Sequence, residues 1–116
     1  MPLGEQPERF YHGFVLGLIV ELSSEYEVTS NRESGFGRYD VAIEPKDKEG
    51  IAIILEFKVF NSKKEKNLED TVQAALNQIE EKQYETALIA KGIAKEQIYK
   101  YGFAFKGKEV LIGGFL

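Results

Sequence analysis

Asp40, Glu56 and Lys58 are the residues of this sequence whose types and spacing are most able to do chemistry. Glu56 and Lys58 lie two positions apart within residues 51–60, where apolar β-branched and aromatic residues predict a buried central strand. Because side chains alternate along a strand, Glu56 and Lys58 share one face. Charges on such a face need a partner, a metal ion or water at a cleft. The plain structural alternative is an ion pair between these two side chains.

Asp40 belongs to a second predicted strand, residues 38–44, which a polar turn joins to the central strand. In an ordinary antiparallel register, Asp40 lies across from Glu56 or Lys58 on the same face. Two converging carboxylates repel each other unless a proton or a divalent cation lies between them. Oxygen ligands in a chain without cysteine favour magnesium or manganese over zinc. A cation beside a lysine suits attack of water on a phosphodiester, where negative charge builds on the phosphoryl oxygens.

The elements around these residues predict one α/β domain spanning residues 1–116. Residues 1–7 show no periodicity and predict a short arm, and residues 8–23 predict an amphipathic helix because apolar side chains recur at every third or fourth position. Gly13 and Gly17 lie four apart within that helix and each destabilises it by about 1 kcal/mol. We therefore expect this glycine ridge to pack closely against a neighbouring element.

Three predicted strands follow the helix, at residues 26–32, 38–44 and 51–60, and short turns join them into an antiparallel meander. Residues 68–79 predict a second helix, capped by Asn67 with Asp70 three residues on. The remaining chain predicts a short strand at 86–90, a short helix at 94–101 ended by Gly102, and a terminal hairpin of residues 103–105 and 109–112. The order αβββαβ contains a strand–helix–strand crossover, which requires a mixed sheet flanked by helices on both faces.

Composition limits the classes of protein that this chain can belong to. Its 116 residues are 43% hydrophobic and 29% charged, as in globular proteins. The absence of cysteine excludes a disulfide framework, a thiolate zinc site and a cysteine nucleophile, and it fits a reducing cytoplasm. The apolar run at residues 14–20 is too short to cross a bilayer and lacks the basic flank of a signal peptide, so we expect no membrane partner.

Charge is unevenly distributed along the chain. The net charge of −4 argues weakly against general binding to nucleic acid. However, residues 1–56 hold 5 basic and 11 acidic side chains, whereas residues 57–116 hold 10 basic and 8 acidic side chains. The basic residues of the second part are all lysines, and they form either a solvated surface or a surface that faces phosphates.

Asp40 followed by Glu56-Phe57-Lys58 resembles the D…(D/E)-x-K signature of the PD-(D/E)XK nuclease superfamily, although Tyr39 stands where a proline is usual. The order αβββαβ is similar to the restriction-endonuclease-like core of that superfamily. Longer segments, at residues 11–18, 30–40 and 101–108, resemble a bacterial PD-(D/E)XK-like domain usually found C-terminal to AAA-type ATPase domains. The sequence contains no Gly-x-x-x-x-Gly-Lys-Ser/Thr loop, so it resembles the nuclease-like module alone, with an ATPase domain outside this chain as an implied partner.

The resemblance implies a role for each matching position. Asp40 and Glu56 would bind magnesium, or manganese in its place, with the carbonyl oxygen of Phe57 as a further ligand. Lys58 would position or activate the attacking water and stabilise the transition state. The superfamily often adds an acidic residue from the first helix, and Glu8 is the candidate here.

Four further residues are candidates for binding the substrate. Gln78 and Tyr84 are similar to the Gln…Tyr motif of RecB-type nucleases, which helps to place DNA at the site. Arg32 and Arg38 flank the glycine-rich turn at residues 33–37 and could hold a phosphate, because the planar guanidinium donates several hydrogen bonds. The alternative is a surface network with two glutamates, Glu33 and Glu44.

We therefore expect a magnesium-dependent nuclease that cuts nucleic acid, with DNA as the substrate because most relatives act on DNA. One alternative is a catalytically silent nucleic-acid-binding or regulatory module tethered to an ATPase. Another is a protein-interaction domain in which Glu56 and Lys58 form only a structural pair. A homodimer is also an expectation, since small members of the superfamily often need two sites to cut both strands.

Overall fold

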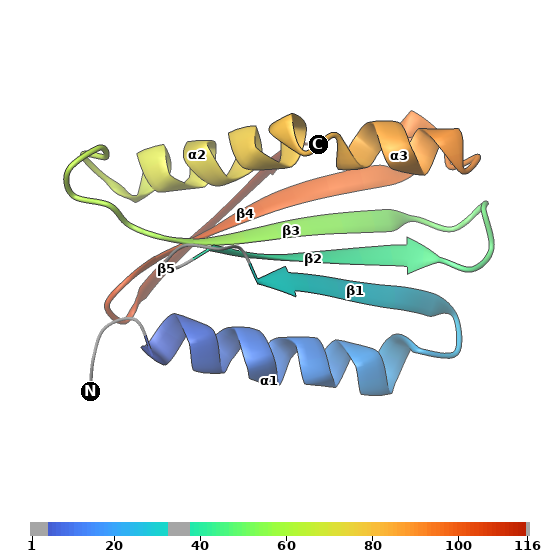
Figure 1. Ribbon diagram of the computed structural model, residues 1–116, viewed down its shortest axis with the longest axis horizontal. Coiled ribbons are helices and arrows are strands. Elements are labelled where there is room, and N and C mark those ends of the chain that lie inside the picture. The colour runs from blue at the N-terminus through green and yellow to red at the C-terminus, as the bar shows by residue number, and fades with distance from the viewer. Residues whose placement is uncertain (1–4, 33–37, 116) are drawn as a thin grey trace.

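The computed structural model describes residues 5–32 and 38–115, with side chains from Phe10 onward except those of residues 11, 32 and 115. A five-stranded sheet lies between α1 on one face and α2 and α3 on the other (Figure 1). The elements in chain order are α1 (Glu5–Leu22), β1 (Tyr26–Arg32), β2 (Arg38–Pro45), β3 (Ala52–Val59), α2 (Leu68–Glu81), α3 (Tyr84–Ala90), a 3₁₀ turn (Lys95–Gln97), β4 (Ile98–Lys106) and β5 (Glu109–Phe115).

The strands follow one another across the sheet in the order β1-β2-β3-β4-β5. The first three pair as an antiparallel meander, β3 and β4 are parallel, and β4 and β5 form a hairpin. The connection from β3 to β4 runs through α2 and α3, because parallel neighbours need a long crossover. The predicted α/β class, the αβββαβ core and the mixed sheet flanked by helices are confirmed.

Each face of the sheet carries its own hydrophobic core. The core on the α1 side is rich in aromatic rings, with Phe57 only 1% exposed and its ring centroid 4.8 Å from that of Phe103. The core on the α2 side is aliphatic and includes Ile54 and Ile79. Side chains alternate along β3 as predicted, so Glu56 faces α2 on the same side as the buried Ala52 and Ile54.

Two predictions for the C-terminal half are wrong. Residues 86–90 belong to a helix, α3, in which only Leu88 is fully buried. Most of residues 94–101 is not helical, because β4 begins at Ile98 and buries alternate residues through Gly102. Short apolar runs fit both the helical and the strand period, so packing against the rest of the fold decides between them.

Two predictions for α1 are also wrong. The helix begins at Glu5, so residues 5–7 are not part of an arm, and Pro7 is tolerated because it lies in the first turn. The glycine ridge does not pack closely: within the described part of the chain, no heavy atom comes within 4 Å of a Cβ built at Gly13 or Gly17. This ridge faces away from the sheet.

No helix in the described ranges is long and apolar enough to span a bilayer.

Gly102 brings α2 close to the sheet beside Glu56, its partner in the parallel register. A Cβ at this buried position would lie 3.0 Å from the carbonyl oxygen of Val72 and 3.1 Å from Cβ of Ala75. We expect Gly102→Ala to destabilise the protein by about 1–3 kcal/mol, because both contacts belong to packed helix atoms. Urea unfolding measures this. Gly13→Ala is the control and should stabilise the protein by about 1 kcal/mol; equal stability of both variants would contradict the expectation.

Candidate active site

The register of β2 and β3 places Asp40 directly opposite Glu56. Both side chains face α2, and both are buried, with 1% and 0% of their surface exposed. Opposite residues of an antiparallel pair have Cβ atoms about 5 Å apart, so the two carboxylates converge. The predicted juxtaposition of these residues is confirmed, and Lys58 lies two pairs further along, on the same face and opposite Arg38.

A lysine from the end of α2 reaches between the two carboxylates. The Nζ atom of Lys82 donates to Oδ2 of Asp40 at 2.6 Å and to Oε1 of Glu56 at 3.2 Å. The Lys82 side chain is only 17% exposed. The predicted alternative of an ion pair between Glu56 and Lys58 is therefore wrong. Sequence reasoning missed Lys82, and nothing in its local sequence distinguishes it from a solvated helix-end lysine.

Lys58 is held by a different carboxylate. Its Nζ atom lies 2.6 Å from Oε2 of Glu65, in the loop between β3 and α2. The other oxygen, Oε1, accepts hydrogen bonds from the backbone N–H of Asn61 and the hydroxyl of Thr71, each at 2.8 Å. Burial raises the pKa of Glu65, but the hydrogen bonds from Lys58, Asn61 and Thr71 outweigh it and leave this pKa below its ordinary value. Glu65 was also missed from the sequence, where it is a lone acid among lysines.

Tyr84, the first residue of α3, fixes the orientation of Asp40. Its hydroxyl donates to Oδ1 of Asp40 at 2.8 Å, and Nδ2 of Asn31 donates to the same oxygen at 3.2 Å. The chain reaches this position through Gln83, whose φ of 57° is left-handed and separates α2 from α3. Three donors in the described part of the chain thus reach Asp40, from β1 and from both sides of the α2–α3 junction.

Burial, and secondly the hydrogen bond to Asp40, raise the pKa of Tyr84 to about 12. The folded protein therefore holds the phenolic proton more tightly than the unfolded chain, where the pKa is about 10. We expect stability to fall as the pH rises from about 10 to about 12, and to fall less steeply in Tyr84→Phe. Unfolding curves and tyrosinate absorbance measure this. Tyr99→Phe is the matched control, since Tyr99 lies on the other face of the sheet; equal changes in both variants would contradict the assignment.

The other predicted substrate residues lie near this cluster with fewer contacts. Gln78 is half-buried on α2, one turn before Lys82, and within the described residues its side chain makes no hydrogen bond to either carboxylate. Arg38 is half-buried, and its Nε has no hydrogen-bond partner in the described part of the chain. For the alternative of a surface network, Glu44 pairs with Lys91 at 3.1 Å, and within the described residues no ion pair joins it to Arg38.

For three of the predicted positions, the structure does not describe the side chain. The side chains of Glu8 and Arg32, and all of Glu33, lie outside the described residues, so the structure places only the backbone of the first two, in α1 and at the end of β1. The Phe57 ring lies in the α1-side core, which leaves its backbone carbonyl as the group proposed for a ligand.

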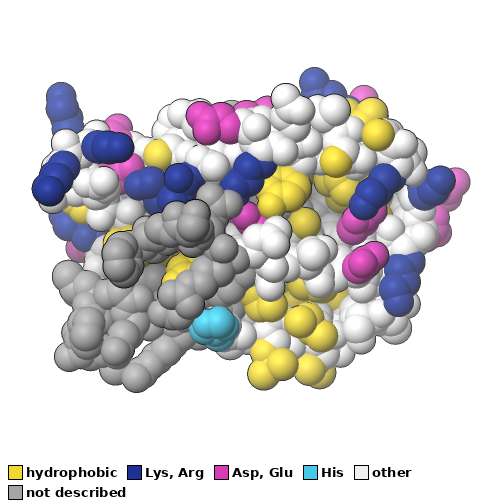
Figure 2. All heavy atoms as spheres, in the orientation of Figure 1, with side chains coloured by type: hydrophobic (Ala, Val, Ile, Leu, Met, Phe, Trp, Pro, Cys, Tyr) yellow, Lys and Arg dark blue, Asp and Glu magenta, His cyan; other side chains and the backbone are white. Residues whose placement is uncertain are grey.

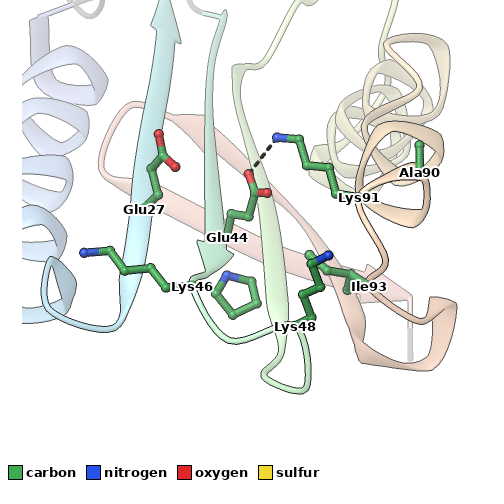
Figure 3. Close-up of a pocket in the computed structure, with 8 residues that line it drawn as sticks. Glu27, Glu44, Lys46, Lys48, Ala90, Lys91 and Ile93 are labelled. Atoms are coloured by element: carbon green, nitrogen blue, oxygen red, sulfur yellow. Dashed lines mark hydrogen bonds and ion pairs between the residues drawn. The ribbon is translucent and has the colours of Figure 1, made fainter.

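A separate cavity of about 580 Å³ opens at the other end of β2 (Figure 3). It contains neither Asp40 nor Glu56, and three lysines alternate around it with two glutamates, one of which accepts from Lys91. Opposite charges nearly balance there, so this cavity is a weaker candidate for chemistry than the carboxylate pair. Its lining residues are Glu27, Glu44, Pro45, Lys46, Lys48, Ala90, Lys91 and Ile93.

Exposed lysines gather at the end of the molecule where β3 leaves the sheet (Figure 2, left). The loop after β3 and the turn between β4 and β5 adjoin there, since Nζ of Lys106 lies 4.7 Å from the ring centroid of Phe60. Positive charge at this end is the kind of surface that phosphates contact. The exposed lysines of the two segments are Lys63, Lys64, Lys66, Lys106 and Lys108.

The sequence as a whole also matches a known family. The sequence model of the PD-(D/E)XK nuclease superfamily matches residues 6–114, from α1 to the end of β5. The chain belongs to the PD-(D/E)XK nuclease superfamily. Members of this superfamily are generally nucleases, and they typically use divalent metal ions. No curated protein and no solved structure matches the chain.

The donors at the carboxylate pair are suitable for a divalent metal ion. Two carboxylates on one face supply the oxygen ligands that magnesium and manganese prefer. The space between them already accommodates a positive charge, the ammonium of Lys82. In the described residues no group of three or more acidic, histidine or cysteine side chains comes together, so further ligands would be backbone, water or an undescribed side chain.

Proposed function

We propose that this protein is a metal-dependent nuclease that hydrolyses phosphodiester bonds of nucleic acid, with DNA as the expected substrate. The main support is the buried pair of Asp40 and Glu56, opposite each other in register, with Lys58 next along the same face in a chain of this superfamily. We propose magnesium as the cofactor and manganese as its substitute.

Asp40 and Glu56 would hold the metal ion, with the carbonyl of Phe57 and the side chain of Glu8 as further proposed ligands. The ion would supply Lewis-acid stabilisation of charge on the phosphoryl oxygens. Tyr84 keeps Asp40 in a fixed orientation, so that one ligand is positioned before the ion arrives.

Lys58 would orient the attacking water and stabilise the transition state. An ammonium group has three donors, so Lys58 can keep its bond to Glu65 and offer another N–H to a water molecule. The bond to Glu65 thereby fixes the position of the Lys58 ammonium, at the end of β3 beside the carboxylates.

The lysine-rich end of the molecule would contact the nucleic-acid backbone, because phosphates attract lysines from neighbouring loops. Gln78, Arg32 and Arg38 are proposed substrate contacts at the same end of β2. We further propose that the domain acts as a homodimer or beside an ATPase domain outside this chain, and in the cytoplasm.

The test is cleavage of labelled single-stranded, duplex, flapped and four-way DNA and of RNA, with magnesium, with manganese and with a chelator. Metal-dependent cutting that Lys58→Ala loses would support the proposal, and the preferred substrate would identify the class of nuclease. Lys63→Ala is the matched control, since Lys63 is an exposed lysine of the adjoining loop. Absence of cutting by folded protein on every substrate would exclude the nuclease.

A second candidate is a silent nucleic-acid-binding or regulatory module. Its support is that both central groups are already engaged, with Lys82 between the carboxylates and Lys58 bonded to Glu65. This candidate predicts DNA binding that weakens steeply with salt, without cutting. Absence of both binding and cutting would leave a protein-interaction domain.

A further inference from the structure

Lys82 joins the end of α2 to the buried carboxylate pair of the sheet. Its backbone ends α2, with its N–H bonded to the carbonyl of Gln78 at 3.1 Å, so the Cα position is fixed by the helix. Its long side chain then turns inward to a site that is closed off from solvent. The stem has four rotatable carbons, so the ammonium can move without movement of the helix.

Lys82 lies between two buried negative charges, which is a large charge for a buried site. Asp40 and Glu56 are 1% and 0% exposed and directly opposite in register, so each carboxylate loses hydration and repels the other. The ammonium of Lys82, at 2.6 and 3.2 Å, offsets part of this cost. A proton or a cation between two carboxylates relieves their repulsion, and in this structure the Lys82 ammonium lies there.

Lys100 shows how a structural lysine differs. It too bridges two carboxylates on the α2 side, Glu80 at 2.6 Å and Glu85, but Glu80 is 51% exposed and both acids lie on the helices. Water can therefore reach Glu80 without Lys100. The carboxylates at Lys82 are 1% and 0% exposed, because strands and helix enclose them.

We propose that Lys82 is the resting counter-ion of the site: its ammonium fills the metal position between Asp40 and Glu56, and an incoming divalent cation displaces it. This inference rests on the proposed metal-dependent function. It makes Lys82 a positioning residue that keeps the two ligands together in the metal-free protein and sets how tightly the ion binds. Binding of the ion costs the two bonds of Lys82, so the affinity is lower than the carboxylates alone would give.

The experiment is calorimetric titration of manganese alone into the wild-type protein, Lys82→Met and Lys82→Gln. We expect the variants to bind manganese about ten- to a hundredfold more tightly, because the ion no longer competes with two charged hydrogen bonds. We also expect the metal-free variants to melt at lower temperature and to gain more thermal stability on adding manganese. Lys82→Gln, which keeps a hydrogen-bonding side chain, serves if Lys82→Met fails to fold.

Two controls separate this role from a structural one. Lys100→Met should lose stability without any change in manganese affinity, and Asp40→Asn should lose manganese binding. If the wild-type protein binds manganese and the Lys82 variants bind it no more tightly, the inference is overturned while the proposed function stands. If folded wild-type protein and folded Lys82 variants all fail to bind manganese, both are overturned.

Discussion

Asp40→Asn should lower metal-dependent cleavage by about 10³-fold or more while leaving the protein folded. The amide keeps an oxygen that can accept from Tyr84, and Lys82 keeps Glu56 as a partner, so the packing of the site survives. What disappears is the negative charge of one proposed metal ligand, which is worth several kcal/mol of transition-state stabilisation. Cleavage of labelled DNA over a range of magnesium concentrations measures the loss.

Glu44→Gln is the matched control for this variant. Glu44 lies on the same strand and the same face as Asp40, four residues further on, and its side chain is 20% exposed and paired with Lys91. It should cut at the wild-type rate. A folded Asp40→Asn protein that cuts as fast as Glu44→Gln would show that Asp40 is not a metal ligand in the reaction.

Glu65→Ala should have the largest effect on stability, a loss of about 3 kcal/mol. The change removes the acceptor of short hydrogen bonds from three donors: the ammonium of Lys58, the N–H of Asn61 and the hydroxyl of Thr71. Lys58 and Thr71 then keep only the longer contacts to the carbonyls of Val59 and Asn67, at 3.4 and 3.5 Å. Glu65→Gln keeps one oxygen for the two neutral donors and should lose about half as much. Urea unfolding at neutral pH measures both. Glu49→Ala, at an exposed acid in the turn before β3, is the control and should change stability by less than about 0.5 kcal/mol.

The wild-type protein and Glu65→Ala should also differ in how their stability depends on pH in acid. Because the pKa of Glu65 is lower in the folded protein than in the unfolded chain, its stabilisation is present above about pH 4.3 and is lost as the pH falls through the folded value. The stability difference between the wild-type protein and Glu65→Ala should therefore shrink in acid. A difference that stays constant at every pH would mean that the carboxylate charge contributes nothing.

Much of the N-terminal half was predictable because its signals are local. Long amphipathic and alternating segments gave α1, the meander and α2, and the side chain of Asn67 caps α2 by accepting from the N–H of Asp70 at 2.9 Å. The reciprocal bond of a capping box is shifted, since Asp70 accepts from the N–H of Lys66 instead. After α2, only the terminal hairpin of β4 and β5 was predictable.

The two errors in secondary structure after α2 share one cause. Residues 84–90 and 98–102 are short, and each fits more than one period until it is packed. Leu88 contributes to the α2-side core from a helix, and Lys100 and Gly102 lie on the α2 face of a strand. Whether each segment becomes a helix or a strand depends on how the connection from β3 to β4 packs back onto the sheet. This packing is a property of the whole domain.

The sequence by itself determined that Asp40, Glu56 and Lys58 share a face, because alternation and a short turn are set by neighbouring residues. Only the tertiary structure decided which side chains compensate them. Lys82 and Glu65 reach the site from the end of α2 and from the loop before it, 26 and 7 residues from their partners Glu56 and Lys58. Such long side chains have many possible partners along the chain, and a unique one is selected only when the docking of α2 fixes the distances and excludes water.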